Sequence, residues 1–122
     1  MTLKECYEIL GGGYEDVLSR FMSERLVQKF VIKFLDDKSF DTLKSSLEIG
    51  NYEEAFRAAH TIKGICQNLG FEKLLHSSSS LTEALRNKQY NITDELFLKV
   101  QADYIDAVRA INVYNNDHVL CP

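Results

Sequence analysis

The chain has 122 residues, a net charge of −4 and a hydrophobic content of 45%. This length suits one domain with one core, and the negative charge argues against a general nucleic-acid binder, which needs a basic face to neutralise phosphates. No apolar run is long enough to cross a membrane, and the first residues lack the apolar core of a signal peptide.

Three cysteines bear on the redox compartment. The number of cysteines is odd, and none of them has CxxC spacing: they are Cys6, Cys66 and Cys121. Disulfide frameworks and zinc sites are normally built from paired cysteines. We therefore expect a reduced, cytoplasmic protein.

The first half of the chain predicts short helices. Breakers are rare, since the one proline is the last residue and there are six glycines. Apolar residues recur at helical spacing, and Ser23 and Ser39 can each cap a helix. Gly11-Gly12-Gly13 is interpreted as a hinge, because no Gly-Lys-Ser/Thr ending of a phosphate-binding loop follows. The expected helices cover residues 2–10, 14–22, 24–36 and 39–49.

The second half predicts three longer amphipathic helices. Asn51 can cap the first and Gly70 can end it. Asn91 or Thr93 can cap the last, and we expect residues 115–122 to form a loose tail. The expected helices cover residues 51–69, 71–87 and 94–114.

These elements together predict the fold class. No segment alternates as a strand does, and no internal repeat is visible. Short connections between helices favour antiparallel neighbours. We expect an all-α fold, an antiparallel four-helix bundle with short extra N-terminal helices, in a single domain whose core spans about residues 14–114.

The helix expected at 51–69 carries a histidine opposite its apolar stripe. At about 100° per residue, the stripe consists of Ala55, Ala58, Ile62, Ile65, Cys66 and Leu69. His60 points almost diametrically away from it. The residues that share the face of His60 are Phe56, Arg57, Lys63, Gly64 and Gln67. This histidine therefore faces solvent or a partner.

The neighbours of His60 limit its chemistry. A metal site needs His, Cys or carboxylate ligands one turn away, and a hydrolytic triad needs a nucleophile and an orienting acid; this face offers neither. Lys63, at i+3, can reach a group attached to the imidazole. Gly64 costs the helix roughly 1 kcal/mol relative to alanine, which makes sense if another molecule must come close. An imidazole can carry a phosphoryl group, whose charge Lys63 and Arg57 would offset.

At this point the sequence resembles a known family. His60-Thr61-Ile62-Lys63-Gly64, followed by Leu69-Gly70, is similar to the His-x-x-Lys-Gly-x5-Gly signature of histidine-containing phosphotransfer (HPt) domains. The similarity covers roughly residues 10–112 and includes Gly50-Asn51-Tyr52-Glu53 as well as Leu74, Leu81 and Leu85. It implies a four-helix bundle in which His60 accepts a phosphoryl group from a receiver-domain aspartate or a kinase and passes it to another receiver aspartate.

The resemblance also implies roles for the neighbours of His60. Lys63 would stabilise the phosphoryl group, and Gly64 would leave room for the receiver. Gln67 departs from the family, which usually has a small residue there. Its amide could donate a hydrogen bond to the phosphoryl group or obstruct docking, and the sequence leaves both open. We further expect Phe56 and Asn68 to contact the partner.

The expected partners are response-regulator receiver domains and a (hybrid) histidine kinase. The chain has no glycine-rich nucleotide loop, so we expect a monomeric phosphocarrier, not an enzyme. It would need no metal or cofactor of its own, because the resemblance places Mg²⁺ on the receiver. We expect no nucleic-acid or membrane partner. His76 and His118 are weaker candidates, because His76 has no cation at i+3 and His118 lies in the expected tail.

One alternative remains open. The same face could sequester a receiver or kinase without carrying phosphate, and partner binding would then survive a His60→Gln substitution with no transfer at all.

Overall fold

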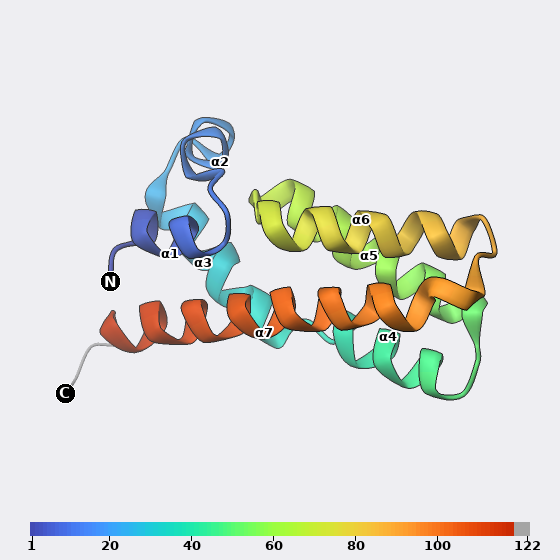
Figure 1. Cartoon of the computed structure of the whole chain (residues 1–122). Coiled ribbons are helices and arrows are strands. Elements are labelled where there is room, and N and C mark those ends of the chain that lie inside the picture. Colours follow the sequence, from blue (N-terminus) through green and yellow to red (C-terminus); the bar gives the residue numbers. More distant parts are fainter. Residues whose placement is uncertain (119–122) are drawn as a thin grey trace.

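The computed structural model describes residues 1–118, and these residues form helices joined by short connections, with no strand among them (Figure 1). The predicted all-α class is confirmed. None of the helices in this part of the chain is both long and apolar enough to span a bilayer. In chain order the elements are α1 (Leu3–Ile9), α2 (Tyr14–Phe21), α3 (Glu24–Lys33), the 3₁₀ turn η1 (Phe34–Asp36), α4 (Ser39–Glu48), α5 (Tyr52–Leu69), α6 (Glu72–Arg86), the 3₁₀ turn η2 (Tyr90–Ile92) and α7 (Thr93–Asp117).

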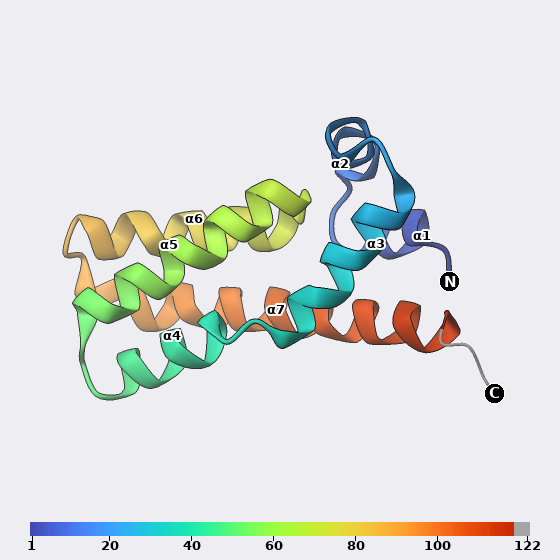
Figure 2. The ribbon, with the colours of Figure 1, turned by 180° about the vertical axis from the view of Figure 1, so that it is seen from behind.

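A helical bundle, as predicted, forms the larger part of the molecule. α5 packs against both α4 and α6, and α6 packs against α7. Figures 1 and 2 show these helices lying lengthwise beside one another, with consecutive helices running in opposite directions. α1, α2 and α3 gather at one end of the bundle, and α7 extends beneath them, where it contacts α1 and α3. That end holds the C-terminus of α5.

Small polar residues inside the bundle let α6 pack closely. Ser78 is fully buried, and its hydroxyl donates to the Leu74 carbonyl at 2.6 Å. Thr82, also buried, donates to the Ser78 carbonyl at 2.7 Å. Bonds back to the preceding turn satisfy these hydroxyls without a partner from another helix. Ser78 and Thr82 therefore belong to the packed core.

Two of the predicted caps are present and two are not. The Ser23 hydroxyl accepts from the Leu26 N–H, and the Asn51 side chain accepts from the Glu54 N–H. The prediction for Ser39 was wrong. Ser39 is the first residue of α4, and its N–H donates to the Asp37 carboxylate at 3.0 Å. An acidic side chain two residues earlier thus supplies the acceptor.

The boundaries of α7 also differ from the prediction. No side chain caps its N-terminus, neither Asn91 nor Thr93, and the Thr93 hydroxyl donates to the Tyr90 carbonyl at 3.0 Å. The helix continues to Asp117, so the first part of the expected loose tail is helical. The Asp117 carboxylate lies 2.6 Å from the N-terminal ammonium of Met1, which ties the two ends of the described chain together. Residues 119–122 of the expected tail lie outside the described residues.

The N-terminal helices close the end of α5. The last four carbonyls of a helix have no donor within the helix itself, but in α5 each of these carbonyls accepts a hydrogen bond. The backbone N–H groups of Gly70 and Phe71 donate to the Cys66 carbonyl. Arg20 donates to the carbonyls of Gln67 and Asn68, at 3.4 and 2.8 Å, and the Tyr7 hydroxyl donates to that of Leu69 at 2.6 Å. The segment that precedes the bundle therefore fixes the end of α5.

Two buried thiols make the fold less stable as the pH rises into the alkaline range. Cys6 and Cys66 are free and buried. Burial raises the pKa of the Cys6 thiol to about 11, and it raises the pKa of the Cys66 thiol even further. Both thiols keep their protons in the folded state and lose them near pH 9 in the unfolded state. Their contribution to stability is therefore complete below pH 9 and is lost as the pH rises.

We expect the free energy of unfolding to fall by about 2 kcal/mol between pH 8 and pH 10 on account of these thiols. Urea unfolding at the two pH values measures the change. The matched control is the double variant Cys6→Ala/Cys66→Ala, whose stability should depend much less on pH in this interval. An equal loss in the control would show that the thiols do not carry the effect.

Candidate functional site

α5 presents His60 on the exposed side of the bundle. The apolar stripe of the helix is buried except for Ile65, which is half-buried. His60 is exposed, as its position opposite the stripe predicted. Because both helix ends are held, by the Asn51 cap and by the donors from α1 and α2, the histidine stands on a fixed element.

The Phe56 ring stacks with His60 and is not fully exposed to solvent. The two ring planes are 5° apart and the ring centroids are 5.9 Å apart, an offset parallel arrangement. Phe56 is half-buried and packs against the core. The guanidinium carbon of Arg86, from α6, lies 5.1 Å from the centroid of the Phe56 ring. The aromatic residue expected at the docking surface therefore has partners within this chain.

Lys63 and Gly64 lie on the C-terminal side of His60. Lys63 is half-buried, and within residues 1–118 no carboxylate lies within ion-pair distance of its ammonium. Gly64 is exposed, and a Cβ atom added to it would meet nothing within 4 Å. A cation and an open helix surface thus lie on the same side of the imidazole.

Arg57 pairs with acidic side chains of its own helix. Its guanidinium lies 2.9 Å from the carboxylate of Glu53 and 3.1 Å from that of Glu54, in the turn that precedes it. Glu53 and Glu54 lie four and three residues before Arg57, and carboxylates at these spacings on a helix favour ion pairs with its guanidinium. That Arg57 offsets the charge of a phosphoryl group on His60 stays a prediction.

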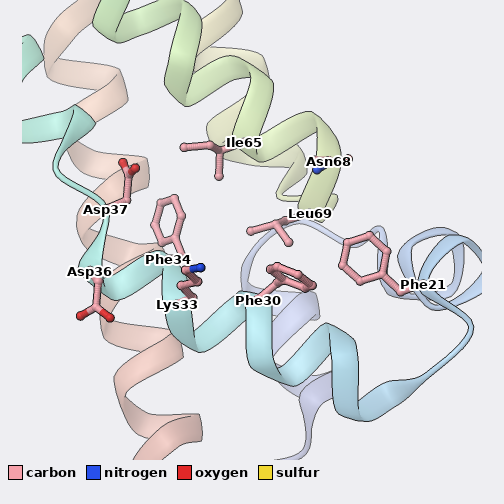
Figure 3. Close-up of a pocket in the computed structure, with 9 residues that line it drawn as sticks. All are labelled: Phe21, Phe30, Lys33, Phe34, Asp36, Asp37, Ile65, Asn68 and Leu69. Atoms are coloured by element: carbon pink, nitrogen blue, oxygen red, sulfur yellow. The ribbon is translucent and has the colours of Figure 1, made fainter.

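Gln67 and Asn68 lie further along α5 and are both exposed. Their backbone carbonyls accept from Arg20. Asn68 lines a pocket of about 600 Å³ between α2, α3, η1 and the C-terminal half of α5. The residues that line it are Phe21, Phe30, Lys33, Phe34, Asp36, Asp37, Ile65, Asn68 and Leu69. Figure 3 shows the three phenylalanine rings directed toward Ile65 and Leu69 of α5, with both aspartates at one edge.

The other two histidines lie elsewhere. His76 is exposed on α6. Nδ1 of His118 lies 2.8 Å from the Tyr114 carbonyl oxygen, and its ring packs on the Tyr114 ring with centroids 4.2 Å apart. Within residues 1–118 no group of three or more His, Cys, Asp or Glu residues could hold a metal ion. His60 is the histidine that combines exposure, a neighbouring cation and an open helix surface.

A comparison with known families agrees with this site. A family model described as the Hpt domain matches residues 25–111, which is more than half of the chain. The chain belongs to the Hpt-domain family. No solved structure matches it. The matched part of this Hpt domain begins within α3 and includes all of α5, whereas α1 and α2, which hold the end of α5, precede it.

The stability of a Gly64→Ala variant tests whether the surface of the Hpt domain is open at this position. In Gly64→Ala the free energy of unfolding should rise by about 0.5–1 kcal/mol, because alanine favours the helix and the new methyl group meets nothing within 4 Å. Urea unfolding measures the rise. A variant that is less stable than the wild type would contradict the open surface.

Arg86 is the neighbour of the site that the sequence interpretation missed. It lies on α6, far from His60 along the chain, and reaches Phe56 only because α5 and α6 pack together. Its Nε also lies 3.3 Å from the Glu83 carboxylate, one turn earlier. No local spacing signals such a contact, since helix patterns identify neighbours on the same helix only.

Proposed function

We propose that this Hpt-domain protein is a phosphocarrier of a phosphorelay, in which His60 takes a phosphoryl group from a receiver aspartate and passes it to another. The observation that carries the proposal is an exposed His60 on a fixed helix, with Lys63 one turn further on and an open surface at Gly64. Membership of the Hpt family supports the same role.

The proposed step joins the imidazole of His60 to the phosphoryl group of a phosphorylated receiver aspartate. A lone pair of a ring nitrogen attacks phosphorus, so that an N–P bond forms while the bond from phosphorus to the aspartate oxygen breaks. The electron pair of the broken bond leaves with the aspartate carboxylate. Lys63 would offset the negative charge of the phosphoryl group on His60. The reverse of this step, with a second receiver, hands the group on.

In this proposal the chain meets its partners in turn through one face. The partners are response-regulator receivers and a (hybrid) histidine kinase, and we place the Mg²⁺ and the acidic pocket of the reaction on the receiver. A monomer in the cytoplasm fits this order of encounters, because the face around His60 must be free for each partner.

A second candidate function is sequestration of a receiver or kinase without phosphate transfer. The observation that favours it is Gln67, which is exposed two turns beyond His60 on the same side of α5. Its side chain could allow a partner to bind while holding the phosphoryl donor out of reach. Receiver binding would then be unaffected by the loss of His60.

A transfer experiment distinguishes the two candidates. Receiver domains from the same cell are phosphorylated with labelled phosphate, freed of their donor and mixed with the protein. The phosphocarrier proposal predicts that label moves to this chain from at least one receiver, in a form that is labile in acid and stable in alkali. A receiver that binds tightly and transfers nothing would support sequestration, and transfer from no receiver would contradict the phosphocarrier.

A further inference from the structure

A row of three residues runs along the exposed side of α5. Phe56, His60 and Gly64 follow one another at intervals of four residues, which is close to one turn each. Side chains on a helix lean toward its N-terminus, so each covers the residue about one turn before it. The imidazole therefore lies over the Phe56 ring, and Gly64 has no side chain that could cover the imidazole.

The observed geometry agrees with this description. The rings of Phe56 and His60 are nearly parallel, with an interplanar angle of 5° and a centroid separation of 5.9 Å. Nothing lies within 4 Å of the position of a Cβ atom at Gly64. The imidazole therefore forms an offset stack with an aromatic ring, and the helix surface at Gly64 is open.

Phe56 is itself held in place. It packs against the buried core, and the Arg86 guanidinium lies over its ring with Cζ 5.1 Å from the centroid. An arginine over an aromatic face is attracted by the charge distribution of the ring. Because α5 and α6 both contribute, the ring provides a fixed platform and not a mobile surface side chain.

We propose that Phe56 is a positioning residue for His60. Its ring, held by the core and by Arg86, stacks on the imidazole and so fixes the plane of the imidazole ring. The lone pair of the reactive nitrogen lies in that plane, so its direction toward an incoming phosphoryl group is fixed as well. The inference rests on the proposed role of His60 as the phosphorylated residue. It replaces the sequence-based expectation that Phe56 contacts the partner. An offset aromatic pair shifts a conformational equilibrium by about two- to tenfold, which sets the size of the expected effect.

A phosphodonor without a protein partner separates positioning from docking. Phosphoramidate transfers its phosphoryl group to histidine directly, so the rate of labelling at His60 does not depend on any docking surface. Phe56→Leu keeps an apolar side chain of similar size and removes the ring, whereas Phe56→Tyr keeps the ring. Phe97→Leu is the matched control, because Phe97 is also half-buried but packs on Phe40 between α4 and α7.

In Phe56→Leu we expect labelling of His60 by phosphoramidate to slow by about twofold to tenfold. Phe56→Tyr should recover most of the wild-type rate, and Phe97→Leu should match the wild type. Transfer from a phosphorylated receiver should slow by a similar factor. Normal phosphoramidate labelling with slow receiver transfer would overturn the proposal in favour of docking, and a Phe56→Tyr variant as slow as Phe56→Leu would also overturn it.

A second measurement uses the wild-type protein and so does not depend on the folding of a variant. Nuclear Overhauser contacts between the ring protons of Phe56 and His60 are expected in solution, and their absence would overturn the proposal. The phosphoramidate arm also separates this inference from the proposed function. Receivers that never label the wild type would refute the phosphocarrier, while the dependence of phosphoramidate labelling on Phe56 would still decide the positioning role.

Discussion

A His60→Gln variant is expected to fold like the wild type and to take up no phosphoryl group from any phosphorylated receiver. His60 is exposed, and substitutions at exposed positions usually change the free energy of unfolding by no more than about 0.5 kcal/mol. Glutamine has a side-chain amide nitrogen that is not a nucleophile, so the N–P bond cannot form. The rate of label transfer and urea unfolding of the same sample measure the two expectations.

The matched control for this loss is His76→Gln. His76 is also an exposed helical histidine, but it lies on α6 and is not part of the row on α5. This control should accept label at the wild-type rate. Label that persists in His60→Gln and disappears in His76→Gln would place the phosphorylated residue on α6 and refute the present assignment.

Gly70→Ala is expected to lower the free energy of unfolding by about 2–5 kcal/mol. Gly70 ends α5 in the left-handed region, with φ = 71°, which costs a residue with a Cβ atom about 1–2 kcal/mol. Its added Cβ would also clash with Cγ2 of the buried Val17 on α2 and would lie 3.1 Å from the Gly13 carbonyl oxygen. Overpacking of this kind adds roughly 1–3 kcal/mol. Urea unfolding measures the total.

Gly50→Ala separates the two contributions. Gly50 has φ = 72°, almost the same backbone conformation, but a Cβ atom added there would meet nothing within 4 Å. Its substitution should therefore cost only the conformational part, about 1–2 kcal/mol. The difference between the two variants reports the close contact of α2 with the end of α5. Equal losses would contradict that contact.

The sequence predicted those helices whose signals are local. The helix that carries His60 was expected at 51–69 and is observed at Tyr52–Leu69, because Asn51 and Gly70 provide a cap and a left-handed end within the sequence itself. The end of α7 was not predictable in this way. Its last turn is tied through Asp117 to the N-terminal ammonium, which lies at the other end of the described chain.

The candidate site also contains features that local spacing predicts and features that depend on the packing of helices. His60, Lys63 and Gly64 share one helix face, so the helical period places them together without knowledge of the fold. The approach of Arg86 to Phe56 depends on the packing of α6 against α5, which no spacing encodes. The pairing of Arg57 with Glu53 and Glu54 follows from their i−4 and i−3 spacing in the sequence, so it is also a local feature of this helix.

The pocket beside α5 depends on tertiary packing and not on local sequence signals. Its aromatic walls come from α2, α3 and η1, and its base comes from Ile65 and Leu69 of α5. Among these phenylalanines Phe34 is buried, whereas Phe30 is exposed. Which of them faces an open pocket depends on how the N-terminal helices dock on the bundle, and this is a tertiary property.

The position of the phosphoryl group after reaction with a receiver tests the central claim most directly. The protein is incubated with a phosphorylated receiver, digested at neutral to alkaline pH to preserve phosphohistidine, and mapped by tandem mass spectrometry. The account predicts one modified residue, with the phosphoryl group on a ring nitrogen of His60. A phosphoryl group on His76, His118 or a carboxylate, or none at all with every receiver, would contradict it.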